Sequence, residues 1–409
     1  MTPIHLDAKF WSGFAQNFWE KKPLAVKNVQ SGLREVTAAE IFELLVLFAN
    51  RCRKLKDPEG FKLYIDSFRA DADTTLQLLP GKKDKSLTGY HERMEKHFSD
   101  YCLVCDELLK VNLKSLHLLT DFTDQLYRHV GFPNRFAEIG LYLGNYRKTP
   151  FGVHVDSCGV FSFPVLGKKR FRLWSPEFAA KNPALDRASK YEKFKKRSQV
   201  IDAEAGDMTY WPSSAWHIAE SDGSFSATWS LGIWVDRPHV DLLMAPLKSV
   251  LAKKIGPASE AVATEFECLH GVTGEVTELP QAFSHSIELL QSLNAQELHE
   301  TFLKFWMQHI SLQGFKNIPS EEFKLSMKSR IRLRSPGALV LWQQGSEKSY
   351  FSFAGALAEG ARGGSLLRLI RAINNGQTCH VDAYLKGKSG NTDLLALQTL
   401  AKGGAFSLA

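Results

Sequence analysis

Apolar residues near the N-terminus recur at helical spacing, with one strand-like break. Pro23 ends the first helical segment, and residues 24–27 have the composition of a short strand. Thr37 and Glu40 then have the spacing of a capping box ahead of an apolar run. We therefore expect residues 1–125 to be mostly helical. The first helix is indicated by aromatic residues that share one helical face: Phe10, Trp11, Phe14 and Phe18.

The pattern changes between about residues 138 and 240, where short apolar runs are separated by glycine and proline. Several short strands at this spacing are typical of an all-β sandwich or barrel. A polar and basic stretch, 186–198, interrupts the series, and we interpret it as a surface insertion. The strand-like runs are 139–143, 160–166, 171–174, 208–211 and 227–235.

Helical periodicity returns over 280–312 and is followed by a smaller mixed unit. There, 339–342 and 350–353 have strand composition, whereas 365–373 and 392–401 have helical periodicity. We therefore expect an α+β fold in which helices precede and follow a β core, with a small α/β module at the C-terminus.

The composition is that of a folded chain in a reducing compartment. Of the 409 residues, 44% are hydrophobic and 23% are charged, and we find no apolar run of the roughly 18 residues that a membrane span needs. The N-terminus lacks the pattern of a secretory signal, and six scattered cysteines do not suit a disulfide scaffold. We expect a cytoplasmic protein without membrane association. The net charge of +7 fits either solubility or an acidic partner.

Four His-x-Asp triplets could carry metal chemistry, because residues i and i+2 of a strand point to the same face. Thirteen histidines and 44 acidic residues predict about 1.4 His-x-acid triplets by chance. Spacing alone therefore does not choose among the four, which are His5/Asp7, His154/Asp156, His239/Asp241 and His380/Asp382.

The surroundings favour His154 and Asp156. Only this pair precedes a long strand-like run and, 61 residues after the acid, a strand that ends in a Pro/Ser turn and presents His217. Two histidines and one carboxylate on one side of a metal leave open positions, as in non-haem Fe(II) oxygenases. We interpret the other three pairs as surface or capping residues.

A second candidate lies in the basic run at 168–170. Lys169 is 13 residues beyond Asp156, so one strand can leave the metal, turn and return beside it. A cation there could bind the distal carboxylate of an acid that chelates iron at its other end. The alternative is a solvated basic face, although the flanking apolar alternation would point at least one of the three cations inward.

These motifs together resemble the core of JmjC-type, cupin-fold Fe(II)/2-oxoglutarate oxygenases. The resemblance rests on 154–156, on the strand pair 160–174 and on 206–217. Within that group the chain is most similar to the bacterial ribosomal oxygenases, which hydroxylate a side chain of a ribosomal protein. Residues 18–26 resemble the N-terminal segment of that group, and 229–233 resemble the strand that follows its second iron histidine.

The resemblance implies a double-stranded β-helix (jelly-roll) with His154, Asp156 and His217 as Fe(II) ligands and Lys169 bound to the tail of 2-oxoglutarate. Succinate and CO₂ would be the co-products of hydroxylation. Some relatives also use an asparagine where this chain has Gly140; Tyr142 or Asn145 could substitute for it. We expect a pocket lining of Trp216, Trp229 and Phe161, unless these aromatic residues only pack the β core.

The resemblance also implies three segments and a homodimer. The segments are an oxygenase domain at 1–245, a helical linker and dimerisation region at 246–325 and a winged-helix-like domain at 326–409. A basic chain with such an end could instead be a DNA-binding regulator. However, we find no short helix there rich in base-reading residues, so we do not expect direct nucleic-acid binding.

We therefore predict a 2-oxoglutarate-dependent hydroxylase of a protein or peptide side chain, a ribosomal protein being one possibility. The alternatives are a hydroxylase of a specialised peptide or small metabolite, a demethylase, and a non-catalytic metal-binding regulator. Among the cysteines, Cys102 and Cys105 have the spacing of a redox motif but fall in an expected helical region, and Cys158 faces the ligand side of a regular strand. We interpret all three as buried structural residues.

Overall fold

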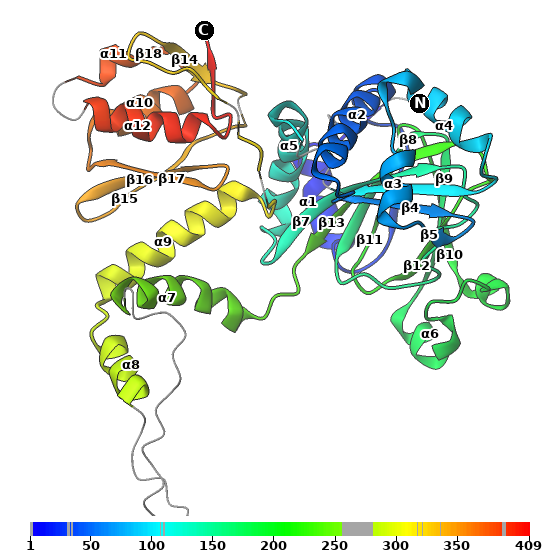
Figure 1. The fold of residues 1–409 in the computed structure, drawn as a ribbon. Helices are drawn as coiled ribbons and strands as arrows, with labels where there is room; N and C mark the ends of the chain where they lie inside the picture. Colours follow the sequence, from blue (N-terminus) through cyan, green and yellow to red (C-terminus); the bar gives the residue numbers. More distant parts are fainter. Residues whose placement is uncertain are drawn as a thin grey trace, which may run out of the picture.

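The structure is a computed structural model in which two antiparallel sheets make up much of the N-terminal part of the molecule, at the right of Figure 1. The larger sheet has eight strands in the order β2-β11-β8-β13-β7-β6-β4-β5, and the smaller has three in the order β10-β9-β12. The structure describes residues 3–30, 33, 36–106, 108, 111–255, 281–316, 318–320, 322–335, 337–386 and 390–409.

The strands of the first 245 residues supply both sheets. Their bounds are β1 Ile4–His5, β2 Leu24–Val26, β3 Val29–Gln30, β4 Phe61–Ile65, β5 Phe68–Arg69, β6 Tyr101–Asp106, β7 Phe136–Gly144, β8 Gly159–Leu166, β9 Lys168–Trp174, β10 Gln199–Glu204, β11 Met208–Trp211, β12 Trp216–Glu220 and β13 Ser226–Trp234. The helices of this region are α1 Ala8–Asn17, α2 Ala38–Leu55, α3 Ala72–Leu78, α4 Leu87–Glu95, α5 Leu113–Val130 and α6 Pro176–Lys181.

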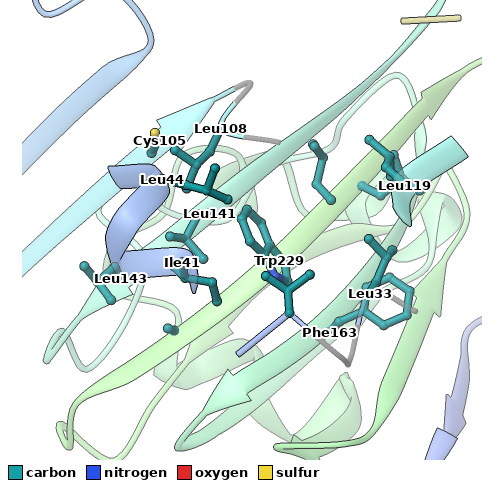
Figure 2. Close-up of a cluster of buried hydrophobic side chains, with 14 of the residues drawn as sticks. Leu33, Ile41, Leu44, Cys105, Leu108, Leu119, Leu141, Leu143, Phe163 and Trp229 are labelled. Carbon is teal, nitrogen blue, oxygen red and sulfur yellow. The ribbon is translucent and has the colours of Figure 1, made fainter. Parts of the chain in front are cut away.

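The central strand β13 shows why the larger sheet has one dry face and one polar face. Its odd-numbered residues are fully buried and apolar, whereas its even-numbered residues are small, polar or at the sheet end. Because successive side chains of a strand point to opposite faces, the odd set packs against the helices and the even set faces the smaller sheet. Figure 2 shows Trp229 of the odd set in the core, near side chains such as Leu119 from α5 and Ile41 from α2.

The N-terminal helices begin where the sequence predicts. Asp7 caps α1 by accepting the N–H of Phe10, and Thr37 and Glu40 form the complete capping box of α2. The expectation of a mostly helical segment up to residue 125 is wrong in part, because β4 and β6 lie within it and extend the larger sheet. The run 101–105 is buried along its whole length, and an apolar run without alternation does not distinguish a strand from a helix.

The insertion between β9 and β10 is packed onto the smaller sheet rather than simply solvated. It contains α6 and two 3₁₀ turns, and it buries Leu185, Tyr191 and Phe194. The indole N–H of Trp174 on β9 donates to the carbonyl of Phe194 at 3.0 Å. The basic residues of the segment other than the half-buried Lys195 remain exposed, so the expected surface position holds for most of its charges only.

Three helices connect the double sheet to a C-terminal unit (Figure 1). They are α7 His239–Ile255, α8 Gln281–Gln291 and α9 Ala295–Leu312; residues 256–280 of the expected linker lie outside the described residues. No helix of the described chain is long and apolar enough to span a bilayer. The C-terminal elements are β14 Arg330–Leu333, β15 Leu341–Gln344, β16 Lys348–Phe353, β17 Ala356–Ala361, α10 Ser365–Asn374, β18 Cys379–His380, α11 Val381–Tyr384, α12 Gly390–Ala401 and β19 Phe406–Leu408.

The C-terminal unit has its own hydrophobic core. Helices α10 and α12 lie over the sheet β15-β16-β17 and bury residues such as Leu366, Ile370 and Leu397 with Phe351 of the sheet. This cluster is separate from the core of the larger sheet.

Candidate active site

Three potential metal ligands converge between the two sheets. The ligand atoms of His154, Asp156 and His217 all lie within 4.8 Å of one another, and this is the only such group among the described residues. The Nε2 atoms of His154 and His217 are 3.7 Å and 3.4 Å from the carboxylate oxygens of Asp156. Two reciprocal backbone hydrogen bonds, of 3.0 and 2.7 Å, join residues 154 and 217 and fix this approach.

Both imidazoles are held in the tautomer that a metal requires. Nδ1 of His154 is 3.0 Å from the carbonyl of Gly152, and Nδ1 of His217 is 3.1 Å from the carbonyl of Ala215. A carbonyl can only accept a hydrogen bond, so each Nδ1 carries the proton and each Nε2 presents its lone pair toward Asp156. Hydrogen bonds made by the ring nitrogen that does not bind the metal orient metal-binding histidines in this way.

The environment keeps His217 neutral. Burial, and then the neighbouring His154, lower the pKa of His217 to about 4. Only 6% of the His217 side chain is exposed, whereas Asp156 is 38% exposed and faces the opening of the site. The ring of Trp211 lies 5.0 Å from that of His217 and covers its inner side. Two imidazole nitrogens with one carboxylate suit a divalent transition metal with open positions.

A residue far away in the sequence holds the turn that presents His217. The carboxylate of Glu20 accepts hydrogen bonds from the Tyr210 hydroxyl at 3.0 Å, from the Ser213 backbone N–H at 3.2 Å and from the Ser213 hydroxyl. Glu20 therefore ties the segment after α1 to the Pro/Ser turn between β11 and β12.

Lys169 points into the same cavity and has no acidic partner. Its side chain is buried, its ammonium donates to the hydroxyl of Tyr146, and it also lies 3.8 Å from the centre of that ring. Within the described chain no carboxylate is at ion-pair distance from this nitrogen. Burial lowers the pKa of Lys169 to about 7. A buried amine without a counter-ion is costly, so this position fits an external acid.

Two buried hydroxyls complete the polar side of this cavity. The side-chain oxygens of Thr149 and Thr228 are buried, line the cavity and have no hydrogen-bond partner within the described residues. Buried polar atoms in native proteins are nearly always satisfied, so these two are available to a ligand. The donor set of Lys169, Tyr146, Thr149 and Thr228 therefore fits a small carboxylate.

The two further candidates from the sequence lie in different places. Tyr142 lines the cavity, and burial raises the pKa of its hydroxyl well above the usual range. Asn145 does not line it: its side-chain oxygen accepts the N–H of Tyr101 at 3.0 Å, and its amide donates to the carbonyl of Ser99. Tyr146, which the sequence analysis did not single out, holds the position beside Lys169.

The cavity measures about 500 Å³ and opens to solvent near the metal ligands. Its mouth includes the exposed side chains of Arg69 and Arg187. On the floor beside Gly140, Lys62 donates to Asp106 at 2.6 Å. An added Cβ at Gly140 would lie 3.2 Å from the carboxylate of Asp106, so the glycine leaves room for that ion pair.

The expected aromatic lining of the cavity is wrong. Trp229 and Phe161 lie in the core on the helix side of the larger sheet, and Trp216 packs against the insertion. Phe151, Phe171, Trp211 and Trp234 line the cavity instead. The alternation in β13 contains the signal that we missed: its even-numbered residues, including Thr228, share the cavity face.

The remaining motifs do not form sites. Cys102 and Cys105 lie on the strand β6 and, being three residues apart, face opposite sides of the sheet, so they are not a redox pair. Cys158 is buried at the cavity wall, and burial raises the pKa of its thiol above the usual range. Asp7 caps α1, and both His239 and Asp241 are exposed at the start of α7.

Comparisons with known proteins agree with this architecture. The JmjC domain model matches residues 119–240. The histidyl-hydroxylase and lysine demethylase NO66 of Drosophila erecta is 29% identical over 118 residues, which is 28% of this chain; the match spans only 18% of that relative's length. The NO66 protein of Drosophila yakuba is 27% identical over the same length.

Solved structures match over almost the whole chain. Escherichia coli ribosomal oxygenase YcfD superposes with a TM-score of 0.53 at 14% identity and covers 98% of both chains. A YcfD structure in complex with cobalt and 2-oxoglutarate has a TM-score of 0.52 at 14% identity and covers 97% of this chain and 98% of its own. Residues 119–240 therefore match the JmjC domain, and the chain as a whole shares the fold of the E. coli ribosomal oxygenase.

Proposed function

We propose that the protein is an Fe(II)- and 2-oxoglutarate-dependent oxygenase that hydroxylates a side chain of a protein or peptide. The observation that carries this proposal is a buried lysine that has no carboxylate partner among the described residues and lies in the same cavity as a His/Asp/His cluster. A structural metal site would not need such an anion position beside it. When bound, the iron and 2-oxoglutarate supply the oxidising power from O₂, with succinate and CO₂ as co-products.

The residues present fit both groups. His154, Asp156 and His217 would hold the metal through two neutral nitrogens and one carboxylate oxygen, the donor set of non-haem iron sites. Lys169 and Tyr146 would bind the distal carboxylate of 2-oxoglutarate, and a charge-assisted hydrogen bond at this depth is strong because water is excluded. Thr149 and Thr228 would donate their free hydroxyls to the same ligand.

The open mouth supports a macromolecular substrate. Asp156 is 38% exposed, and both Arg69 and Arg187 at the rim are exposed, so a side chain of another protein can reach the metal from solvent. The likeness to a ribosomal oxygenase makes a ribosomal protein the first substrate to test. The alternatives are a specialised peptide or small metabolite, demethylation, or a regulator that binds metal without turnover.

The experiment that tests the activity is release of succinate from 2-oxoglutarate by purified protein with Fe(II) and ascorbate. Mass spectrometry of ribosomal and other cell proteins, with and without the gene, then identifies the substrate by a shift of about 16 Da, the mass of one oxygen atom. Absence of succinate in the presence of cell extract would overturn the oxygenase and favour the regulator.

We further propose that the chain consists of three segments, 1–245, 246–325 and 326–409, and that the last of them is winged-helix-like. We also propose that the helices α7, α8 and α9 of the second segment mediate a homodimer. Residues exposed on α7 and α8 are large and apolar and fall at helical spacing: Val240, Leu243, Met244, Phe283, Ile287 and Leu290. Such faces are typical of subunit contacts. Light scattering of the wild type and of Leu290→Asp tests the dimer, which the aspartate should dissociate.

A cytoplasmic location is part of the same proposal. The five cysteines that the structure describes are all unpaired and buried, which is the usual state in a reducing compartment.

A further inference from the structure

The positive charge of the chain is concentrated in its C-terminal unit. Residues 320–409 contain 12 Lys and Arg against six Asp and Glu, a net charge of +6 out of +7 for the whole chain. The oxygenase proposed above has no need of this charge, because its cavity is lined by residues of the double sheet between positions 62 and 234. A partner of the C-terminal unit would therefore be anionic.

Three arginines from two elements gather around one loop of this unit. Arg362 precedes Gly363, and Arg368 donates from Nη1 to the carbonyl of Gly363 at 3.3 Å. Arg371 follows Arg368 by about one turn of α10 and lies on the same helix face. All three side chains belong to exposed residues, and none is at ion-pair distance from a carboxylate in the described structure.

The edge strand β15 adds an aromatic and an amide group to this arginine cluster. The guanidinium of Arg371 lies 5.4 Å from the ring of Trp342, which is still 38% exposed. The side-chain nitrogen of Gln344, two residues on and therefore on the same strand face, is 3.9 Å from where a Cβ of Gly363 would stand. We call the surface formed by Trp342, Gln344, Arg362, Arg368 and Arg371 the arginine–tryptophan patch.

On the other face of the same sheet, two acidic residues have hydrogen-bond or ion-pair partners of their own. Glu359 pairs with Lys348 at 2.6 Å and with Lys304 of α9 at 3.1 Å, and Glu300 accepts the hydroxyl of Tyr350. The arginines of the patch instead donate to neutral acceptors, such as the carbonyl of Ser346 for Arg362. These contacts position the guanidinium groups without neutralising them.

We propose that the arginine–tryptophan patch binds a single-stranded nucleic acid, with RNA as its ligand. Arginines contact phosphates, and an exposed indole provides a surface on which a base can stack. An acidic protein would use the arginines but would have no base to place on the indole. This surface was not expected from the sequence, because a base-reading helix is needed only to recognise duplex DNA. Single strands need only cations and a stacking platform, and these come from β15, the 362–363 loop and α10.

Fluorescence anisotropy with a labelled oligouridine RNA of about 20 nucleotides tests the proposal on the full chain, at about 50 mM NaCl. Replacing Arg362, Arg368 and Arg371 together by glutamine should weaken binding at least 10-fold and lower the salt slope by about two, since each lost phosphate contact removes about 0.7. Trp342→Ala should weaken binding about 5-fold or more at an unchanged salt slope, because it removes stacking rather than charge.

The matched control removes three exposed lysines from the insertion, Lys190, Lys193 and Lys196, by the same change to glutamine. This variant should bind RNA like the wild type, and all variants should retain succinate release, which also reports that they are folded. Equal RNA affinity of the arginine variant and the wild type, or competition by polyglutamate as strong as by unlabelled RNA, would overturn the proposal. Stronger binding of duplex DNA than of the single-stranded RNA would overturn it as well. So would stronger binding of a single-stranded DNA of the same length, because the proposal names RNA as the ligand.

Discussion

The two faces of strand β9 both carry basic residues, but these differ in whether they are paired with a carboxylate. On the outer face, Arg172 forms two hydrogen bonds to Glu220, at 3.0 and 2.9 Å, and Arg170 pairs with Asp202 at 2.6 Å. On the inner face, Lys169 is more deeply buried than either and has no carboxylate partner in the described structure. Folding alone would favour the opposite arrangement, because a buried cation costs most when it is unpaired.

From this contrast we propose that a missing partner, rather than the charge itself, marks Lys169 as a functional side chain. The outer ion pairs join β9 to β10 and β12, and the Tyr191 hydroxyl, which donates to Glu220 at 2.7 Å, adds the insertion to them. The inner lysine leaves its charge for a ligand. If this division holds, variants of the inner face should affect turnover and variants of the outer face should affect stability.

Removal of a metal ligand should have the largest effect. We expect His154→Ala or Asp156→Ala to lower succinate release roughly 1,000-fold or more. The reason is that each variant loses the metal, without which the reaction does not proceed. The control is His239→Ala with Asp241→Ala, an exposed pair of the same spacing, which should retain full activity. Turnover by either ligand variant near the wild-type rate would reject the site.

Loss of the inner cation should come next. Lys169→Met should raise the dissociation constant of 2-oxoglutarate about 100-fold, because truncating one partner of a buried charge pair costs about 2–5 kcal/mol. Metal binding, measured separately by titration, should be unchanged. The same variant should stabilise the ligand-free protein by about 1 kcal/mol or more, since it removes a buried amine without a counter-ion. Arg170→Met on the outer face is the control and should change the 2-oxoglutarate affinity less than about 2-fold.

The affinity for 2-oxoglutarate should depend on pH with a predictable sign. The pKa of Lys169 is lowered to about 7 in the free protein, and a bound carboxylate would raise it again. Binding above pH 7 must therefore take up a proton, so the dissociation constant should rise about 10-fold per pH unit between pH 7 and 8.5. Equilibrium dialysis with Mn(II)-loaded protein measures this slope. A slope of the same size in Lys169→Met would assign it to another group.

The outer ion pair should matter for stability and hardly at all for chemistry. Glu220→Gln leaves Arg172 nearly buried without its counter-charge, so we expect the free energy of unfolding to fall by about 3 kcal/mol. Turnover per folded molecule should stay within about 2-fold of the wild type. Denaturant unfolding monitored by circular dichroism, combined with the succinate assay, checks both parts. A large rise in the 2-oxoglutarate requirement would show that the two faces are not independent.

Much of the site could be predicted from the sequence because it depends on local rules. The i, i+2 spacing of His154 and Asp156 places both on one face of an extended segment, and the Pro/Ser turn marks where His217 emerges. Alternation around the basic run predicts that one cation turns inward, and the structure shows that it is Lys169. These inferences need only the period of a strand.

The aromatic lining of the cavity and the side chain that lies beside Lys169 could not be predicted in this way. Trp229 and Thr228 are neighbours in the sequence, and only the packing of α2 and α5 on one face decides which of them meets the cavity. Asn145 is as close to Lys169 in sequence as Tyr146, yet its side chain is used to hold the backbone of Tyr101. Which side chain faces the cavity therefore depends on the packing and pairing of elements that are distant in the sequence.

Residue types and their local spacing define the chemistry that is available: three candidate metal ligands, one inward cation and a basic C-terminal unit. Which of these groups meet depends on the folded chain, because Glu20 reaches Ser213, in the turn before His217, across 193 residues, and the arginine–tryptophan patch joins β15 to α10. Local periodicity orients a side chain relative to its own strand or helix. The partners that it meets or lacks depend on long-range packing, which no window of sequence contains.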